Sequence, residues 1–282
     1  MKKLAVILVF AALQTSCASI DAWRFDAVVK KSCGKTHQCF EKVQAAIDSS
    51  PQDNTKPYRI YIAPGVYKEK ITLATNNVQL LGAGQQKTRI SYGDYAGKLD
   101  ADGKSLGTPR TYTLLVKAKD IRIENLTIEN SFDFLTNDAL VGDDPKKLSG
   151  TQAVALFIDA PSDKVLVRKV SLLGYQDTLF VNSGRSWFDK VFIAGNVDYI
   201  FGKGNALFTH SEIKTLGRGK AIQPNGFVTA PSTQIANQFG FTFIDCRLTR
   251  DKSVPDNSTP LGRPWPPLAP HYHPRRWPLC RP

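Results

Sequence analysis

The 282-residue chain is predicted to be an all-β protein whose short strands stack as the coils of a solenoid. Its middle holds segments that alternate apolar with polar residues and are rich in Val, Ile and Phe, at 78–82, 121–128, 165–173, 186–193 and 241–248. This pattern is typical of half-buried strands. Gly, Asn and Asp mark the joins, and convincing helical runs between the strands are lacking, which argues against a doubly wound α/β sheet. On the strand pattern alone, a β-sandwich remains the alternative.

A second observation favours the solenoid. Asp198 follows Asp177 by 21 residues, and Gln176 follows Gln152 by 24. One coil of a stacked β-solenoid takes roughly 20–25 residues, and neighbouring strands lie about 4.8 Å apart. We therefore expect these polar residues to form a column on three successive coils, with the two acids facing each other.

The first 18 residues have the pattern of a signal peptide. Lys2 and Lys3 precede an apolar run over residues 4–13, and Ser16 and Ala18 suit the −3 and −1 positions of a cleavage site. The run is too short to span a membrane. We expect a secreted, extracellular protein; anchoring through a lipid on Cys17 is the alternative.

One helix is expected near the start of the mature chain, over residues 40–47. Phe40, Val43, Ala46 and Ile47 share one face of it, which suits a short N-terminal capping helix over the open end of a solenoid. The segment from Tyr58 to Gly65 is then expected to form the first strand and its turn.

The net charge indicates which class of partner the protein binds, and the cysteines bear on whether its compartment is oxidising. The formal net charge of +12 falls to +10 once Lys2 and Lys3 are removed. A basic secreted protein without a nucleic-acid motif or basic helix suits an acidic polysaccharide better than nucleic acid. Cys33 and Cys39 are close enough in sequence to form a disulfide, although two free thiols fit equally well.

The other cysteines give no sign of a metal site. Cys246 lies in an apolar strand and is expected in the core. His37, between Cys33 and Cys39, has no second pair of ligands near it in sequence, so neither a metal nor another cofactor is expected.

The polar column favours acyl chemistry over glycosidic cleavage. Two carboxylates facing a cleft indicate acid–base or nucleophilic catalysis. The neighbouring amides of Gln152 and Gln176 could donate to a developing oxyanion, which favours acyl transfer. Inverting glycosidases hold their carboxyl groups about 6.5–9.5 Å apart, wider than adjacent coils provide. Since the sequence has no convincing Ser-His-Asp set, a carboxylate is the expected nucleophile.

Five motifs resemble those of pectinesterases (pectin methylesterases), in the family's order over roughly residues 25–265. They are Gly65-Val66-Tyr67-Lys68-Glu69, Gln152-Ala153-Val154-Ala155-Leu156, Gly174-Tyr175-Gln176-Asp177-Thr178-Leu179, Asp198-Tyr199-Ile200-Phe201-Gly202 and Leu261-Gly262-Arg263-Pro264-Trp265. The resemblance implies a right-handed parallel β-helix that removes methyl esters from polygalacturonate, releases methanol and needs no metal. It further implies a monomer without a membrane span, with methyl-esterified polygalacturonate as its partner.

The resemblance also implies the catalytic roles. Asp198 would attack the C6 ester carbonyl, and Asp177 would protonate the departing methanol and then activate water. Gln152 and Gln176 would hold the oxyanion, and Arg263 would keep Asp198 ionised and aimed. Two close carboxylates resist sharing full charge, and a cation beside one assigns the proton to the other.

Three aromatic residues of the same motifs are expected to bind substrate. Tyr175, Phe201 and Trp265 would offer apolar faces on which sugar rings stack.

The last 17 residues depart from the family. The proline-rich tail 266–282 has no strand pattern, whereas family members continue with further strands. We expect a β-helix domain over residues 19–265 and a truncated or frame-shifted end, with weak or absent activity.

Other functions remain open from the sequence. The chain could be a non-catalytic pectin-binding solenoid, or a pectate lyase, which would need Ca²⁺-binding acids and a proton-abstracting base. A polygalacturonase is disfavoured by the close spacing of the acids.

Overall fold

A computed structural model describes residues 25–34 and 38–265. The expected signal peptide, Cys17, His37, Cys280 and the proline-rich tail 266–282 lie outside the described residues.

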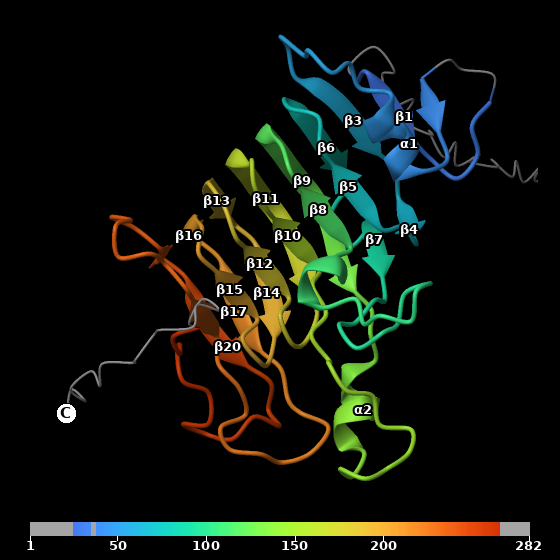
Figure 1. The fold of residues 1–282 in the computed structure, drawn as a ribbon. Coiled ribbons are helices and arrows are strands. Elements are labelled where there is room, and N and C mark those ends of the chain that lie inside the picture. Colours follow the sequence, from blue (N-terminus) through green and yellow to red (C-terminus); the bar gives the residue numbers. More distant parts are fainter. Residues whose placement is uncertain (1–24, 35–37, 266–282) are drawn as a thin grey trace, which may run out of the picture.

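The strands stack along one axis, from β1 to β20, and form a right-handed parallel β-helix, as predicted (Figure 1). All pairings between named strands are parallel, in a 14-stranded and a 6-stranded sheet. The 14-stranded sheet contains β1 (Ala27–Val29), β2 (Cys39–Phe40), β3 (Tyr58–Ile62), β4 (Gly65–Tyr67), β6 (Val78–Gly82), β7 (Thr88–Tyr92), β9 (Lys119–Asn130), β11 (Asp163–Leu173), β13 (Arg185–Asp189), β14 (Phe192–Gly195), β16 (Asn205–Thr209), β17 (Glu212–Thr215), β19 (Phe241–Ile244) and β20 (Arg247–Arg250). The 6-stranded sheet contains β5 (Ile71–Leu73), β8 (Leu114–Val116), β10 (Leu156–Ile158), β12 (Leu179–Val181), β15 (Ile200–Gly202) and β18 (Thr229–Pro231).

The large sheet turns a corner at stacked residues with a left-handed backbone. The N-terminal halves of β9 and β11 pair with β6 and β13, and their C-terminal halves pair with β7 and β14. At the corner, five residues on successive coils have φ between 50° and 55°: Asn125, Lys169, Lys190, His210 and Asp245. Such values are uncommon outside glycine and bend the strand. The single strands predicted over 186–193 and 241–248 were therefore wrong: each is two strands.

A short helix covers the N-terminal end, as predicted. In α1 (Val43–Asp48), Val43, Ala46 and Ile47 are buried, whereas Phe40 belongs to β2 and not to the helix. Both carboxylate oxygens of Glu69 accept hydrogen bonds from the first helical N–H groups, those of Val43 and Gln44, at 2.8 and 3.1 Å. The last residue of the first motif thus satisfies donors that the helix itself leaves unpaired.

The structure distinguishes between a disulfide and two free thiols, which the sequence left open. Cys33 and Cys39 form a disulfide across a Cα–Cα distance of 5.6 Å. Cys246 is a free thiol between β19 and β20, half-buried at the edge of the core rather than within it.

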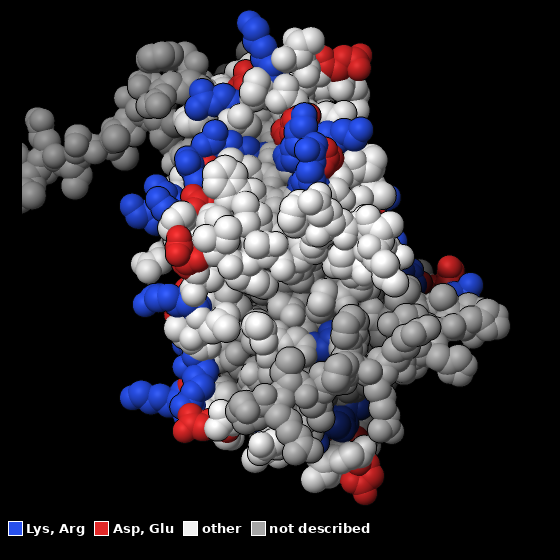
Figure 2. All heavy atoms as spheres, turned by 90° about the vertical axis from the view of Figure 1, so that its left-hand side faces the viewer, with Lys and Arg blue, Asp and Glu red and all other residues white. Residues whose placement is uncertain are grey.

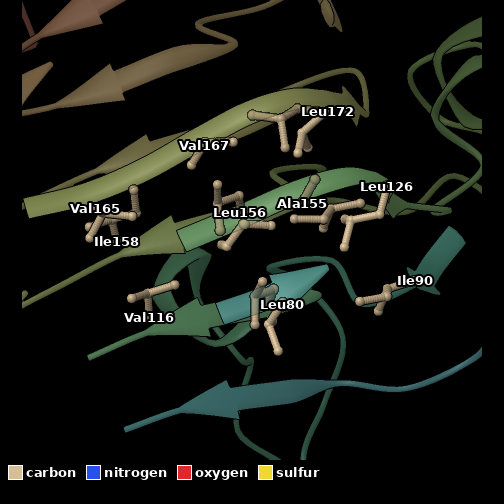
Figure 3. Packing of buried hydrophobic residues seen from close by; sticks show 14 of the residues in the cluster. Leu80, Ile90, Val116, Leu126, Ala155, Leu156, Ile158, Val165, Val167 and Leu172 are labelled. Carbon is tan, nitrogen blue, oxygen red and sulfur yellow. The ribbon is translucent and has the colours of Figure 1, made fainter. Parts of the chain in front are cut away.

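The core consists of side chains stacked in register from coil to coil. One row of fully buried side chains runs through five neighbouring strands, each residue paired with the next: Leu80 in β6, Ile123 in β9, Val167 in β11, Phe188 in β13 and Phe208 in β16. Figure 3 shows Leu80, Leu156, Val167 and their neighbours filling the space between the sheets. The continuous core fixes the height of each coil and so the register of the polar residues at its rim.

The sequence did not predict a second helix, α2 (Phe134–Ala139), or the 3₁₀ turn η2 (Thr108–Arg110). Helix α2 projects beyond the coils with the loop that follows it (Figure 1).

Candidate active site

The two predicted acids stand on consecutive coils, just before β12 and β15 of the 6-stranded sheet. Gln176 pairs with Val197 in a parallel bridge, and the Asp177 N–H donates to the Val197 carbonyl at 3.0 Å. Leu179 then pairs with Ile200 in the same register. Asp177 and Asp198 therefore occupy equivalent positions, as the 21-residue spacing predicted.

Both aspartates adopt a left-handed backbone, with φ of 64° at Asp177 and 49° at Asp198. Aspartate visits this region more readily than most residues because its short side chain can bond locally. Strained conformations of this kind persist where the surrounding structure fixes them, and they cluster at active sites. Here the result is two carboxyl groups side by side, 7% and 6% exposed.

Arg263 reaches Asp198 from a segment 65 residues further along the chain. Its Nε donates to Asp198 Oδ1 at 2.8 Å, and its Nη2 donates to Oδ2. The segment is held by β18, because Gly262 pairs with Thr229 and the Arg263 N–H donates to the Thr229 carbonyl at 3.0 Å. A Cβ at Gly262 would lie 2.5 Å from Thr229 Oγ1, so a larger residue there would force the Thr229 side chain to move.

The charges differentiate the two acids. Burial, and then the nearby charge of Asp198, raise the pKa of Asp177 well above its ordinary value, while Arg263 acts in the opposite direction. The hydrogen bond to Asp198 raises the pKa of Arg263. One carboxyl group is thus held in a two-pronged ion pair, and the other is shifted towards its protonated form.

The glutamines complete the predicted column. The Ala153 N–H, one residue after Gln152, donates to the Gln176 carbonyl at 3.1 Å, so the two segments lie on adjacent coils. The Thr151 hydroxyl donates to the side-chain oxygen of Gln176, Oε1, at 2.6 Å. Thr151 was not predicted from the sequence; its position directly before Gln152 was the available signal.

Two of the three predicted aromatic residues meet beside the acids. Phe201 lies against Trp265 in an edge-on arrangement, with ring centroids 5.3 Å apart. Phe201 is only 2% exposed, whereas Trp265 is 36% exposed and presents the accessible ring. Phe157 and Phe180 extend the stack on the preceding coils. The ring centroids of Phe157 and Phe180 are 4.3 Å apart, and those of Phe180 and Phe201 are 4.2 Å apart. Their one-coil spacing in sequence could have revealed them.

Tyr175 lies elsewhere. Its ring stacks on Phe134 of α2, with a centroid distance of 5.4 Å. Together with Asp133 and Lys214 it lines a cavity of about 460 Å³ that neither Asp177 nor Asp198 lines. Burial raises the pKa of Tyr175, and Asp133 adds to the effect.

An ion pair joins α2 to the loop after β17. Arg218 donates through Nε and Nη2 to the carboxylate of Asp138, at 2.9 and 2.6 Å, and the Gly219 N–H donates to the same group at 3.0 Å. The Arg218 guanidinium also lies 5.4 Å from the centre of the Phe134 ring. This clamp, Asp138–Arg218, connects residues 80 positions apart.

The described residues contain no group of three or more His, Cys, Asp or Glu side chains that could hold a metal ion. Across residues 25–34 and 38–265, no helix is long and apolar enough to cross a membrane.

Comparison with known proteins identifies the family of the chain. The sequence model of the Pectinesterase family matches residues 26–269. Pectinesterase A of Dickeya dadantii (strain 3937) is 40% identical over 253 residues, which cover 88% of this chain and 68% of that protein. The crystal structure of a pectin methylesterase in complex with a hexasaccharide is 41% identical, with a TM-score of 0.82 over 87% of this chain and 72% of the other. Pectin methylesterase from carrot is 26% identical, with a TM-score of 0.70 over 86% and 70% of the two chains. The chain therefore belongs to the pectinesterase family.

Proposed function

We propose that this chain is a carboxylic ester hydrolase that removes the methyl esters of polygalacturonate, the backbone of pectin, and releases methanol. The observation that carries the proposal is the pair of buried carboxyl groups on consecutive coils, of which Asp198 alone is held by the Arg263 fork. Its relatives are named pectinesterases, and one structural relative is described in complex with a hexasaccharide, which supports a polysaccharide substrate.

In the first half of the reaction, an Asp198 carboxylate oxygen bonds to the C6 ester carbon. The carbonyl π electrons move to oxygen, and the amide N–H groups of Gln152 and Gln176 donate to the resulting oxyanion. Asp177 then gives its proton to the methoxy oxygen as the carbon–oxygen bond breaks, so that methanol leaves and an acyl anhydride joins C6 to Asp198. The raised pKa of Asp177 favours the protonated form that this step requires.

In the second half, Asp177 acts as the base. It takes a proton from water while the water oxygen attacks the same acyl carbon. The bond to Asp198 breaks, its carboxylate is restored, and Asp177 is again protonated. The net reaction consumes one ester and one water and yields one carboxylic acid and one methanol.

The surroundings suit a partly acidic polymer. Phe201 and Trp265 provide an apolar wall beside the acids, with Trp265 as the exposed ring. The full chain carries a formal net charge of +12, and Figure 2 shows Lys and Arg side chains along one edge of the face it presents, with fewer acidic ones among them. We propose a monomer that is directed into the secretory pathway by a signal peptide, residues 1–18, and meets its substrate outside the cell.

Three products distinguish this function from its rivals. Purified protein on highly methylated pectin is expected to release methanol without new reducing ends and without an unsaturated product that absorbs in the ultraviolet. An ultraviolet-absorbing product would indicate a lyase, and new reducing ends would indicate a polygalacturonase. A folded protein that binds pectin and releases no methanol would contradict the proposal and support the pectin-binding alternative.

A further inference from the structure

The Gln176 main chain is fixed on both sides, but its side chain has a single anchor. The Gln176 carbonyl accepts a hydrogen bond from the Ala153 N–H, and Gln176 pairs with Val197 on the next coil. Among the described residues, the side-chain amide makes one hydrogen bond, in which Oε1 accepts from the Thr151 hydroxyl at 2.6 Å. The residue is only partly buried, and its Nε2 donors have no hydrogen-bond acceptor among the described residues.

The direction of this amide matters for ester hydrolysis. A glutamine side chain presents an acceptor oxygen on one side and two N–H donors on the other. Only the donors stabilise an oxyanion, and an oxygen turned towards it would repel it. With Oε1 directed at Thr151, Nε2 points away from Thr151.

Thr151 is well placed for this task. It directly precedes Gln152, so one short segment supplies both an oxyanion donor and the anchor for the other donor. A hydrogen bond accepted by Oε1 also polarises the amide and strengthens its N–H donors. The same contact limits rotation of a long side chain, whose freedom would otherwise have to be lost at the moment of reaction.

We propose that Thr151 is a positioning residue that holds the Gln176 amide with its N–H groups towards the oxyanion. The inference rests on the proposed function, because it gives Gln176 the role of oxyanion donor. Thr151 itself touches no reacting atom and acts only through Gln176.

The test compares two substitutions at position 151 with a matched control. Thr151→Val keeps the shape and removes the hydroxyl, and we expect kcat for methanol release to fall about 10-fold with little change in KM, because displacement by about 1 Å can cost up to 100-fold. Thr151→Ser keeps the hydroxyl and is expected to restore kcat to within about twofold of the parent. Thr249→Val is the control: Thr249 is also half-buried and donates to a side-chain oxygen on the neighbouring coil, Glu212 Oε1, at 2.9 Å, far from the acids in sequence. It is expected to leave kcat unchanged.

A double-mutant cycle separates positioning from a general structural effect. In the background of Gln176→Ala, Thr151→Val is expected to change kcat by less than about twofold, because the group through which it acts is gone. Equal losses from Thr151→Val in both backgrounds, or a Thr151→Ser variant as slow as Thr151→Val, would overturn the inference. Failure of the parent to release methanol, or full activity of Gln176→Ala, would instead count against the proposed function.

Discussion

Asp177 and Asp198 lie in register on consecutive coils, and both hold a left-handed backbone with their carboxyl groups buried. The stack of coils brings the groups together, and the Arg263 fork makes them unequal. This asymmetry underlies the reaction proposed above, since one acid must attack while the other carries a proton. Asparagine tolerates the same backbone region, so aspartate-to-asparagine variants change the chemistry with little change in the fold.

Asp177→Asn is predicted to stabilise the protein increasingly as the pH rises. The pKa of Asp177 is raised in the folded state, so its favourable contribution is complete below the unfolded pKa and is lost as the pH rises through the folded pKa. Asparagine is neutral at every pH and avoids that loss. Melting temperatures of parent and variant across pH 4 to 9, a range of about five units around these values, should diverge towards alkaline pH. A constant difference, or a variant that is less stable at high pH, would contradict the shift.

Arg263→Gln is predicted to lower kcat and to move the alkaline limb of the pH profile to higher pH. Arg263 lowers the pKa of Asp177, so its removal raises that pKa further and keeps the acid protonated to higher pH. We expect kcat to fall by about 100-fold or more, because Asp198 loses the group that aims it. The check is kcat against pH for parent and variant; an alkaline limb that moves to lower pH would contradict the assigned electrostatics.

Arg218→Met is predicted to destabilise the fold by about 3–5 kcal/mol, because it leaves the Asp138 carboxylate buried without its partner. Burial alone would raise the pKa of Asp138, but the hydrogen bonds and charge of Arg218 bring it below its ordinary value. The stabilisation is therefore present above the unfolded pKa and is lost as the pH falls through the folded pKa.

Denaturant unfolding at neutral pH measures the effect of Arg218→Met. The double variant with Asp138→Asn serves as the control and should recover part of the loss, since no charge then remains buried. If the single variant unfolds like the parent, the clamp has no structural role.

Loss of the disulfide is predicted to cost about 2 kcal/mol, the value for a short loop in the chain-entropy account. The disulfide joins Cys33, which follows β1, to Cys39 of β2, the strand that pairs with β1 beside the capping helix. The double variant Cys33→Ser with Cys39→Ser should therefore unfold at lower denaturant than the parent. Cys246→Ser is the matched control, because Cys246 forms no disulfide, and it should change the midpoint much less.

The sequence predicted the solenoid and the column of polar residues because both depend on spacing along the chain. One coil takes a nearly constant number of residues, so Gln152, Gln176, Asp177 and Asp198 could be aligned before any coordinates were known. The capping helix followed from the shared apolar face of Phe40, Val43, Ala46 and Ile47, although Phe40 lies outside the helix. The family followed from five motifs in order.

Other features depend on tertiary structure and left little local signal. The corners at Lys190 and Asp245 divide apolar-rich segments that contain neither glycine nor proline to mark the break. Helix α2 has only six residues, and an ion pair with Arg218, 80 positions away, helps to hold it. The stacking of Tyr175 on Phe134 of α2 was likewise not predicted, because the spacing of residues along the chain does not determine where a side chain at a turn points.

The most direct test of the account is the rate of methanol release from highly methylated pectin by the parent and by Asp198→Asn. Asparagine keeps the size and backbone preference of aspartate but is not a competent nucleophile. The account predicts methanol from the parent and a loss of at least about 1,000-fold in the variant, with an unchanged β-rich circular dichroism spectrum. A folded Asp198→Asn protein that still releases methanol at the parental rate would contradict the assignment of Asp198 as the nucleophile.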